Sequence, residues 1–177
     1  MPHVRTGLTR IARLSALAAL TCLSMVAWAD DYGDVNQLMK SGKFKEALAK
    51  ADQYLAAKPR DPQMRFLKGL VQTEAGNKTD AIATYSQLTQ DYPELPEPFN
   101  NLAVLYAAQD DFDKARAALE AAVRANPNYA TAHENLGDVY ARLAGQSYAR
   151  AQQLDAGNKA VAAKLAAARQ LLTQPAP

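Results

Sequence analysis

The sequence is poor in the residues that most site chemistry requires. It has one cysteine, Cys22, and two histidines, His3 and His133, among 177 residues. His133 and Glu134 could open an H-E-x-x-H zinc motif, but Gly137 stands where the second histidine should be. Disulfides and zinc clusters need more cysteine and histidine than this, and no serine has a histidine partner in register for Ser–His catalysis. We therefore expect no enzyme activity, no metal and no cofactor.

Long hydrophobic runs are also missing. The longest apolar stretch, residues 14–26, is shorter than the ~20 residues that span a bilayer. Basic residues precede it and Ala-Trp-Ala follows it, which is typical of a secretory signal cleaved after Ala29. We expect a signal peptide at 1–29, a periplasmic mature protein and no membrane span.

Cys22 raises the alternative of a lipid anchor, because lipoprotein signals end at a cysteine that carries the lipid. Such signals place Gly, Ala or Ser before the cysteine, whereas this chain has Thr21. The residues that follow, 23–26, stay mostly apolar instead of turning polar. Simple cleavage after Ala29 is the favoured interpretation.

The expected mature chain has little net charge. Loss of residues 1–29 removes three basic residues and no acidic ones, which leaves 17 basic and 18 acidic residues. A charge of −1 attracts neither nucleic acid nor an anionic lipid surface. The mature chain is rich in alanine and has few β-branched runs, so its composition favours helices.

The strongest pattern in the sequence is a period of 34 residues. Pro59, Pro93 and Pro127 follow this spacing, and so do three alanines, Ala47, Ala81 and Ala115. Each repeat has two apolar-periodic stretches separated by a turn, and the second stretch stops at the proline. The repeats are therefore predicted to be helix pairs.

These residues resemble the tetratricopeptide repeat, a 34-residue helix-turn-helix with the pattern W-x2-L-G-x2-Y in its first helix. The best match is His133-x2-Leu136-Gly137-x2-Tyr140, and Phe99-x2-Leu102-Ala103-x2-Tyr106 is similar. The resemblance implies an all-α, right-handed solenoid. It also implies that His133 packs between helices and that Gly137 lets a neighbouring helix approach.

We expect about 3.5 helix pairs plus a C-terminal capping helix. The predicted domain covers 30–172, with repeats at about 30–61, 62–95 and 96–129 and a shortened repeat at 130–156. The shortened repeat lacks the usual turn, which favours one long helix over 130–155. Gly157 would end that helix, and a helix at 159–172 with its N-cap at Asn158 would cover the exposed end of the stack, before a loose tail at 173–177.

The second repeat departs from the pattern, because Arg65, Lys68 and Gln72 occupy the W, L and Y positions. Either this helix is rotated about its axis, or the long side chains lie along apolar surface with their charges in water. Phe66 and Leu70 are then either an exposed apolar anchor or displaced core.

The resemblance further implies a concave groove lined by first helices. Its predicted residues are Glu97, Asn100, Asn101, Val104, Thr131, Glu134, Asn135 and Asp138, together with Phe66 and Leu70. Asn101 and Asn135 are 34 residues apart, and such amides could pair with the backbone of an extended peptide. The acidic side chains favour a neutral or basic ligand.

The sequence thus predicts a non-catalytic scaffold of the bacterial cell envelope that binds an extended peptide or a partner protein. The alternative is a lipid-anchored assembly factor for outer-membrane or pilus biogenesis. Nothing in the sequence identifies the partner, the pathway or the oligomeric state.

Overall fold

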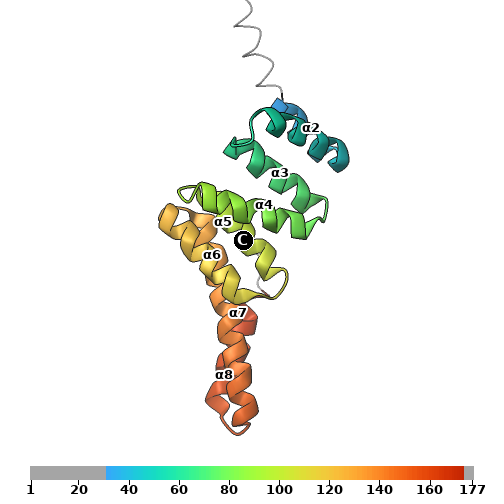
Figure 1. The fold of residues 1–177 in the computed structure, drawn as a ribbon. Coiled ribbons are helices and arrows are strands. Elements are labelled where there is room, and N and C mark those ends of the chain that lie inside the picture. Colours follow the sequence, from blue (N-terminus) through green and yellow to red (C-terminus); the bar gives the residue numbers. More distant parts are fainter. Residues whose placement is uncertain (1–30, 174–177) are drawn as a thin grey trace, which may run out of the picture. The chain divides into compact units, whose positions relative to one another are not determined.

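The structure, a computed structural model, describes residues 31–173, and this part of the chain is built from helices and turns without a strand (Figure 1). The predicted signal peptide and Cys22 lie outside it. Residues 31–40 are helical, and the helices that follow are α2 (Phe44–Ala57), α3 (Pro62–Glu74), α4 (Lys78–Asp91), α5 (Pro96–Ala107), α6 (Phe112–Ala125), α7 (Ala130–Leu154) and α8 (Lys159–Leu171). No helix in the described ranges is long and apolar enough to cross a membrane.

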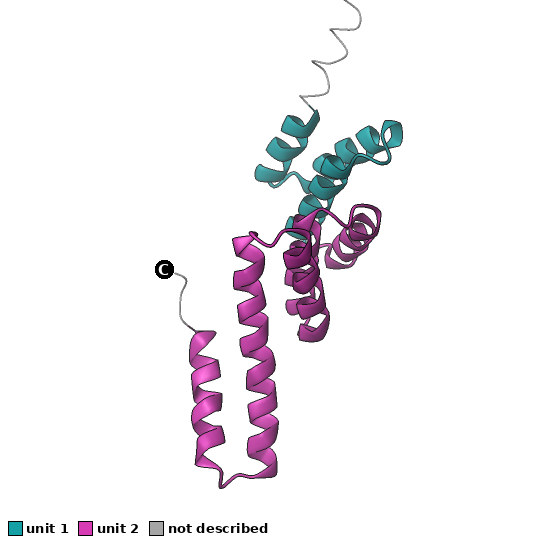
Figure 2. Ribbon diagram, turned by 90° about the vertical axis from the view of Figure 1, so that its left-hand side faces the viewer, with its two compact units in different colours: residues 1–76 teal, residues 77–177 magenta. Residues whose placement is uncertain are grey.

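The chain divides into two compact units with a boundary between Gly76 and Asn77 (Figure 2). The first unit holds the helical stretch 31–40, α2 and α3. The second holds α4 to α8. The single domain predicted over 30–172 stays a prediction.

The helix bounds follow the 34-residue spacing. The second helices α2, α4 and α6 begin at residues 44, 78 and 112 and end at 57, 91 and 125, two residues before the three prolines. The first helices α3, α5 and α7 begin at 62, 96 and 130. Proline cannot continue a helix and restrains the residue before it, so the repeated prolines place every one of these ends.

The turns between paired helices follow the same spacing. Gly42, Gly76 and Asp110 all have positive φ, at 71°, 77° and 58°. Glycine adopts this left-handed conformation without strain, and aspartate tolerates it better than most residues. Asp111, next along the chain, accepts a hydrogen bond from the Lys114 amide at 3.2 Å and caps α6.

The fourth repeat lacks such a turn. The corresponding position is Ala144, a strong helix former, and α7 continues through it for a total of 25 residues. The predicted single helix is thus confirmed, and so is the cap of α8, where Asn158 accepts from the Val161 amide at 3.3 Å. Gly157 does not end α7 as predicted, because α7 stops at Leu154 with Asp155 as its cap.

In the first unit, α3 buries a different face from the one the repeat pattern suggests. Met64 and Val71 are fully buried and Leu67 nearly so. Lys68 is half-buried, and its ammonium group pairs with Asp52 on α2 at 2.6 Å. The buried face through Met64, Leu67 and Val71 fits the rotated-helix alternative, while the half-buried Arg65 and Lys68 also fit long side chains that lie along apolar surface.

Asp61 joins three helical segments of the first unit. One carboxylate oxygen accepts from the Tyr32 and Tyr54 hydroxyls at 2.6 and 2.9 Å, and the other accepts from the Met64 amide at 3.0 Å and caps α3. Burial alone would raise the pKa of Asp61, but the hydrogen bonds from Tyr32, Met64 and Tyr54 outweigh it and hold the pKa below its usual value. Burial and Asp61 together raise the pKa of Tyr32.

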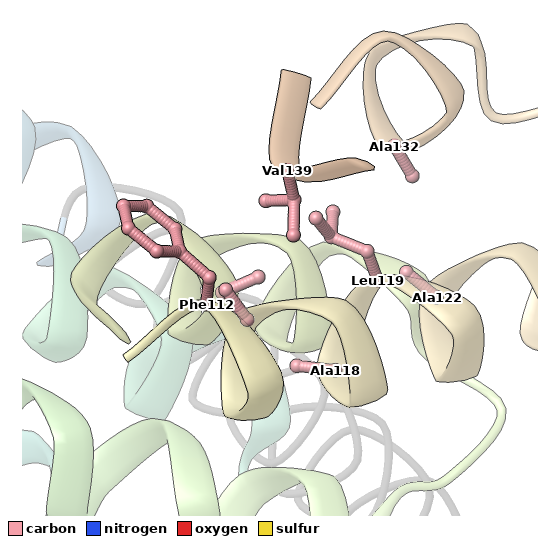
Figure 3. Packing of buried hydrophobic residues seen from close by; sticks show 8 residues of the cluster. Phe112, Ala118, Leu119, Ala122, Ala132 and Val139 are labelled. Carbon is pink, nitrogen blue, oxygen red and sulfur yellow. The ribbon is translucent and has the colours of Figure 1, made fainter. Parts of the chain in front are cut away.

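The second unit has its core between α5, α6 and α7. Small residues dominate this core: Ala103, Ala115, Ala118, Ala122 and Ala132 are all buried. Figure 3 shows Leu119 of α6 pointing toward Val139 of α7, among these alanines. Small side chains let helix backbones approach closely, so a thin layer of larger residues fills the remaining space.

α8 packs antiparallel against the second half of α7, and Figure 2 shows the two helices side by side. A Cβ on Gly145 would lie 3.9 Å from the Ala168 Cβ, and Leu165 and Ala168 are buried. α8 therefore covers the last helix of the stack, as predicted, but along the part of α7 that extends past Leu143, the last α7 residue packed against the core of this unit.

Replacing Asp61 by alanine should destabilise the protein more than replacing Asp111 by alanine. Both changes remove an N-cap, which costs about 1 kcal/mol, but Asp61→Ala also strips the acceptor from two tyrosine hydroxyls. We expect a loss of about 2 kcal/mol or more, against about 1 kcal/mol for Asp111→Ala, in urea unfolding at neutral pH.

The difference in unfolding free energy between wild type and Asp61→Ala should depend on pH. A carboxyl group with a depressed folded-state pKa stabilises the fold above its unfolded pKa of about 4, and this contribution disappears as the pH falls through the folded-state value. The gap between wild type and Asp61→Ala should therefore narrow on acidification. A gap that stays constant from neutral pH down to about pH 3 would contradict this account.

Candidate functional site

A chain of side-chain hydrogen bonds connects α4, α5 and α7 in the second unit. Asn135 Nδ2 donates to Asn100 Oδ1 at 2.8 Å, Asn100 Nδ2 lies 3.5 Å from Asn101 Oδ1, and Asn101 Nδ2 donates to the Tyr85 hydroxyl at 3.3 Å. Tyr85 is fully buried and Asn100 is 5% exposed. Asn101 and Asn135, the two amides of the predicted ladder, both bond to Asn100 in this network.

This changes what the asparagines can offer a ligand. Asn100 was predicted to line the groove, yet it is buried beneath Asn135. Asn101 and Asn135 are partly exposed. The Asn135 Oδ1 makes no hydrogen bond within the described residues, so it keeps a free acceptor. The two exposed amides can contribute single contacts, whereas the Asn100–Asn135 pair holds α5 and α7 together.

Beside this chain lies a cavity of about 220 Å³ between α5, α6 and α7. Its walls come from Ala103, Val104 and Ala107 on α5, Phe112 and Leu119 on α6, and Asn135, Asp138, Val139 and Arg142 on α7. The floor is apolar and the α7 side is polar. Val104 is 49% exposed at the edge. A space of this size accepts one side chain and is smaller than typical small-molecule sites of ~300 Å³ or more.

Two acidic side chains lie on α7, Asp138 in the cavity wall and Glu134 one turn before it. Glu134 and Asp138 are exposed, and neither makes an ion pair or a side-chain hydrogen bond in the described part of the chain. The Arg142 guanidinium lies over the Phe112 ring, 5.8 Å from its centroid. Nearby, burial raises the pKa of Tyr129, and the charge of Glu97 adds to this effect.

Three predicted groove residues, Val104, Asn135 and Asp138, thus line this cavity, and Glu134 lies on the exposed surface of the same helix, one turn before Asp138. Phe66 and Leu70 lie on α3 in the first unit. Both are half-buried, and Leu70 packs against the core of that unit, which fits the displaced-core alternative for Leu70.

Two expectations for residues 133–140 (HENLGDVY) are wrong. His133 is exposed, and its Nε2 lies 2.9 Å from the Pro127 carbonyl oxygen instead of packing between helices. A Cβ built on Gly137 would meet no atom within 4 Å, so no neighbouring helix approaches closely at Gly137. Both errors have one cause: the buried face of α7 runs through Ala132 and Val139, with Leu136 partly buried beside them.

Sequence reasoning missed Arg142 and the α6 residues of the cavity. Arg142 lies one turn after Asp138, and its spacing could have indicated the same helix face. Phe112 and Leu119 look like ordinary core residues, and their access to the cavity depends on how α5 and α7 separate above α6. No local signal predicts that separation.

Comparison with known proteins agrees with this architecture. Residues 32–96 match the family described as tetratricopeptide repeat, and residues 105–143 match one described as TPR repeat. The chain carries tetratricopeptide repeats. The matches fall in both units and include residues 133–140.

Relatives share these repeats within much longer chains. The TPR repeat-containing thioredoxin TTL4 of Arabidopsis thaliana is 33% identical over 120 residues, which are 68% of this chain and 17% of that protein. The probable biofilm formation methyltransferase WspC of Pseudomonas putida is 31% identical over 91 residues, 51% of this chain and 22% of that one. The chain therefore spans about a fifth of the length of these relatives.

Solved tetratricopeptide structures share the fold. The Yersinia enterocolitica type III secretion chaperone SycD, in complex with a peptide of the translocator YopD, has a TM-score of 0.60 at 15% identity and covers 66% of this chain and 94% of its own. The first TPR of Spaghetti (RPAP3), bound to an HSP90 peptide, has a TM-score of 0.60 at 17% identity, with 64% and 90% covered. The structure of MamA has a TM-score of 0.58 at 21% identity, and the match covers 77% of this chain and 82% of MamA. The predicted all-α solenoid fold is confirmed.

Removing the Asn135 amide should destabilise the second unit. Asn135→Ala leaves the buried Asn100 oxygen without its donor, and an unsatisfied buried acceptor costs about 1–3 kcal/mol. Gln146→Ala, an exposed change on the same helix, should stay within about 0.5 kcal/mol of wild type. Urea unfolding of Asn100→Ala, Asn135→Ala and the double variant should give a coupling energy of about 0.5 kcal/mol or more. Additive effects would contradict the pairing.

Proposed function

We propose that this protein is a non-catalytic interaction scaffold that holds an extended segment of a partner protein against α5 and α7 of its second unit. The observation that carries the proposal is the cavity lined by Val104, Asn135 and Asp138, which combines apolar walls with the unpaired carboxylate of Asp138. An extended segment can place one apolar side chain in the cavity while its backbone meets the Asn135 oxygen.

Charge defines the partner further. Glu97, Glu134 and Asp138 are exposed acidic side chains on α5 and α7. Like charges repel, so these residues disfavour an acidic segment and favour a neutral or basic one. The tetratricopeptide structures of SycD and Spaghetti hold peptides in complex, which supports peptide binding as the general use of such a surface.

Synthetic peptides test this proposal directly. We expect peptides of about ten residues with one central leucine to bind more tightly as their net charge rises from about −3 to +3. Asp138→Lys should weaken binding of the basic peptide by roughly tenfold, and Val104→Asp should weaken all of them. Fluorescence polarisation with labelled peptides measures both effects.

Glu94→Lys is the matched control, because Glu94 is exposed in the same unit and is not part of the cavity wall. Its affinities should stay close to those of wild type. Tighter binding of the acidic peptide, or equal losses in Asp138→Lys and Glu94→Lys, would reject the groove as the binding site.

We also propose that the scaffold acts in the bacterial cell envelope after cleavage behind Ala29. The support is the basic, apolar and Ala-Trp-Ala sequence of residues 1–29. The alternative is a lipid-anchored assembly factor of outer-membrane or pilus biogenesis. The intact mass of the exported protein separates the two, since we expect an N-terminus at Asp30. A chain that begins at Cys22 and carries acyl groups would replace this proposal by the lipid-anchored alternative.

A further inference from the structure

Within the second unit, charge changes sign along α7. Residues 77–143 contain ten acidic and five basic side chains, for a formal charge of −5. Residues 144–173, which form the second half of α7 and α8, contain one acidic and four basic side chains, for a charge of +3. We call this second part the C-terminal hairpin.

The cations of the C-terminal hairpin are available to a partner. Arg150, Lys159 and Arg169 are exposed, and no carboxylate of the described chain lies within ion-pair distance of them. Lys164 lies 5.8 Å from the centre of the Tyr148 ring. The single carboxylate, Asp155, accepts a hydrogen bond from the Gly157 amide in the turn.

The tip of the hairpin is also apolar. Leu154, the last residue of α7, is 73% exposed, a larger fraction than the other exposed large hydrophobic residues of the described chain. Arg150 lies one turn before it and Lys159 begins α8 just after it. The tip therefore presents one apolar side chain between two cations.

The cavity between α5, α6 and α7 has the complementary pattern. Its floor is apolar, it holds about one side chain, and Asp138 stands at its edge. Glu134 lies one turn away on α7 and faces solvent. Arg142, the cation in the cavity wall, offers a partner to Asp155 of the tip.

The tip cannot reach the cavity of its own chain. α7 is one continuous helix that carries both Asp138 and Leu154, and Leu154 follows Asp138 by 16 positions, a rise of about 24 Å. A straight helix keeps these points apart, so the two complementary surfaces can meet between two molecules but not within one.

We propose that a second copy of this chain docks the tip of its C-terminal hairpin into this cavity, with Leu154 inserted and Arg150 and Lys159 toward Glu134 and Asp138. The contact is head-to-tail, since different surfaces meet, and such contacts extend into chains or close into rings. The proposal rests on the proposed function in that it uses the same surface. A second copy and an external partner compete for it.

Two leucine variants test the contact in the protein expressed from its full coding sequence, with its N-terminus established by intact mass. Leu154→Ser should weaken self-association on the order of tenfold, and Leu171→Ser, a matched control at 63% exposure on α8, should not. Sedimentation velocity over a concentration series measures both, at about 50 mM and about 500 mM salt, because screening should also weaken the contact. Circular dichroism checks that helix content is unchanged.

Charge variants identify the two surfaces. The triple variant Arg150→Gln, Lys159→Gln, Arg169→Gln removes three of the four hairpin cations, and the double variant Glu134→Gln, Asp138→Asn removes the two acidic side chains at and near the cavity. Each should be monomeric alone, but their mixture should form a complex that stops at one copy of each. Lys40→Gln, Lys45→Gln, Lys78→Gln removes three exposed cations elsewhere and should associate like wild type.

A wild-type protein that stays monomeric up to about 200 µM at low salt would overturn the proposal, and so would equal behaviour of Leu154→Ser and Leu171→Ser. Neither result touches the proposed function, because the labelled peptides still report on the groove. The converse test uses the triple variant of Arg150, Lys159 and Arg169, whose cavity is not occupied by a second copy. If the peptides fail to bind this variant, the proposed function is wrong, while the proposed self-association can still be correct.

Discussion

Burial of small side chains at a fixed interval is the constraint on which the rest of this structure depends. Ala47, Ala81 and Ala115 are fully buried in three successive second helices, 34 residues apart. A methyl group lets two helix backbones approach closely, and the larger residues then have room only where the helices diverge. Because the chain has no cysteine after Cys22, this packing has to hold the described helices without disulfides. The layer of Leu119 and Val139 between alanines in the second unit is one result.

The same regularity explains what happens where it stops. The chain turns at three residues with left-handed backbone conformation: Gly42, Gly76 and Asp110. Ala144, the next residue at the 34-residue spacing, makes no such turn. α7 therefore runs on as one helix past the core, and α8 can pack only against this extension. A missing turn thus creates a two-helix hairpin with its own charge and an exposed tip. The chemistry of the cavity lies on the first half of α7 and that of the hairpin on its second half, so one helix separates two complementary surfaces.

The groove illustrates how an internal role can look like a binding role. Asn101 and Asn135 share a repeat position, and amides at such a position suit a ligand backbone. In the fold, Asn135 first satisfies the buried oxygen of Asn100, and Asn101 donates to Tyr85. Val104 and Asp138 line the cavity together with Asn135. The polar residues that remain available to a ligand are those with no buried partner nearby, and this can be read only once the helices are packed.

The sequence by itself determined the local features of this protein: the repeat length, the helix ends before each proline, the cap at Asn158 and the continuous α7. Each depends on residues a few positions apart, where backbone sterics and capping decide the outcome. The tertiary structure alone decided which face each helix buries. It turned α3 so that Met64, Leu67 and Val71 face inward, left His133 and Gly137 at the surface, and opened a cavity over Phe112 and Leu119. The reason is physical: helix rotation is set by packing against neighbours distant in the sequence, and a difference of one residue in register turns a helix face by about 100°.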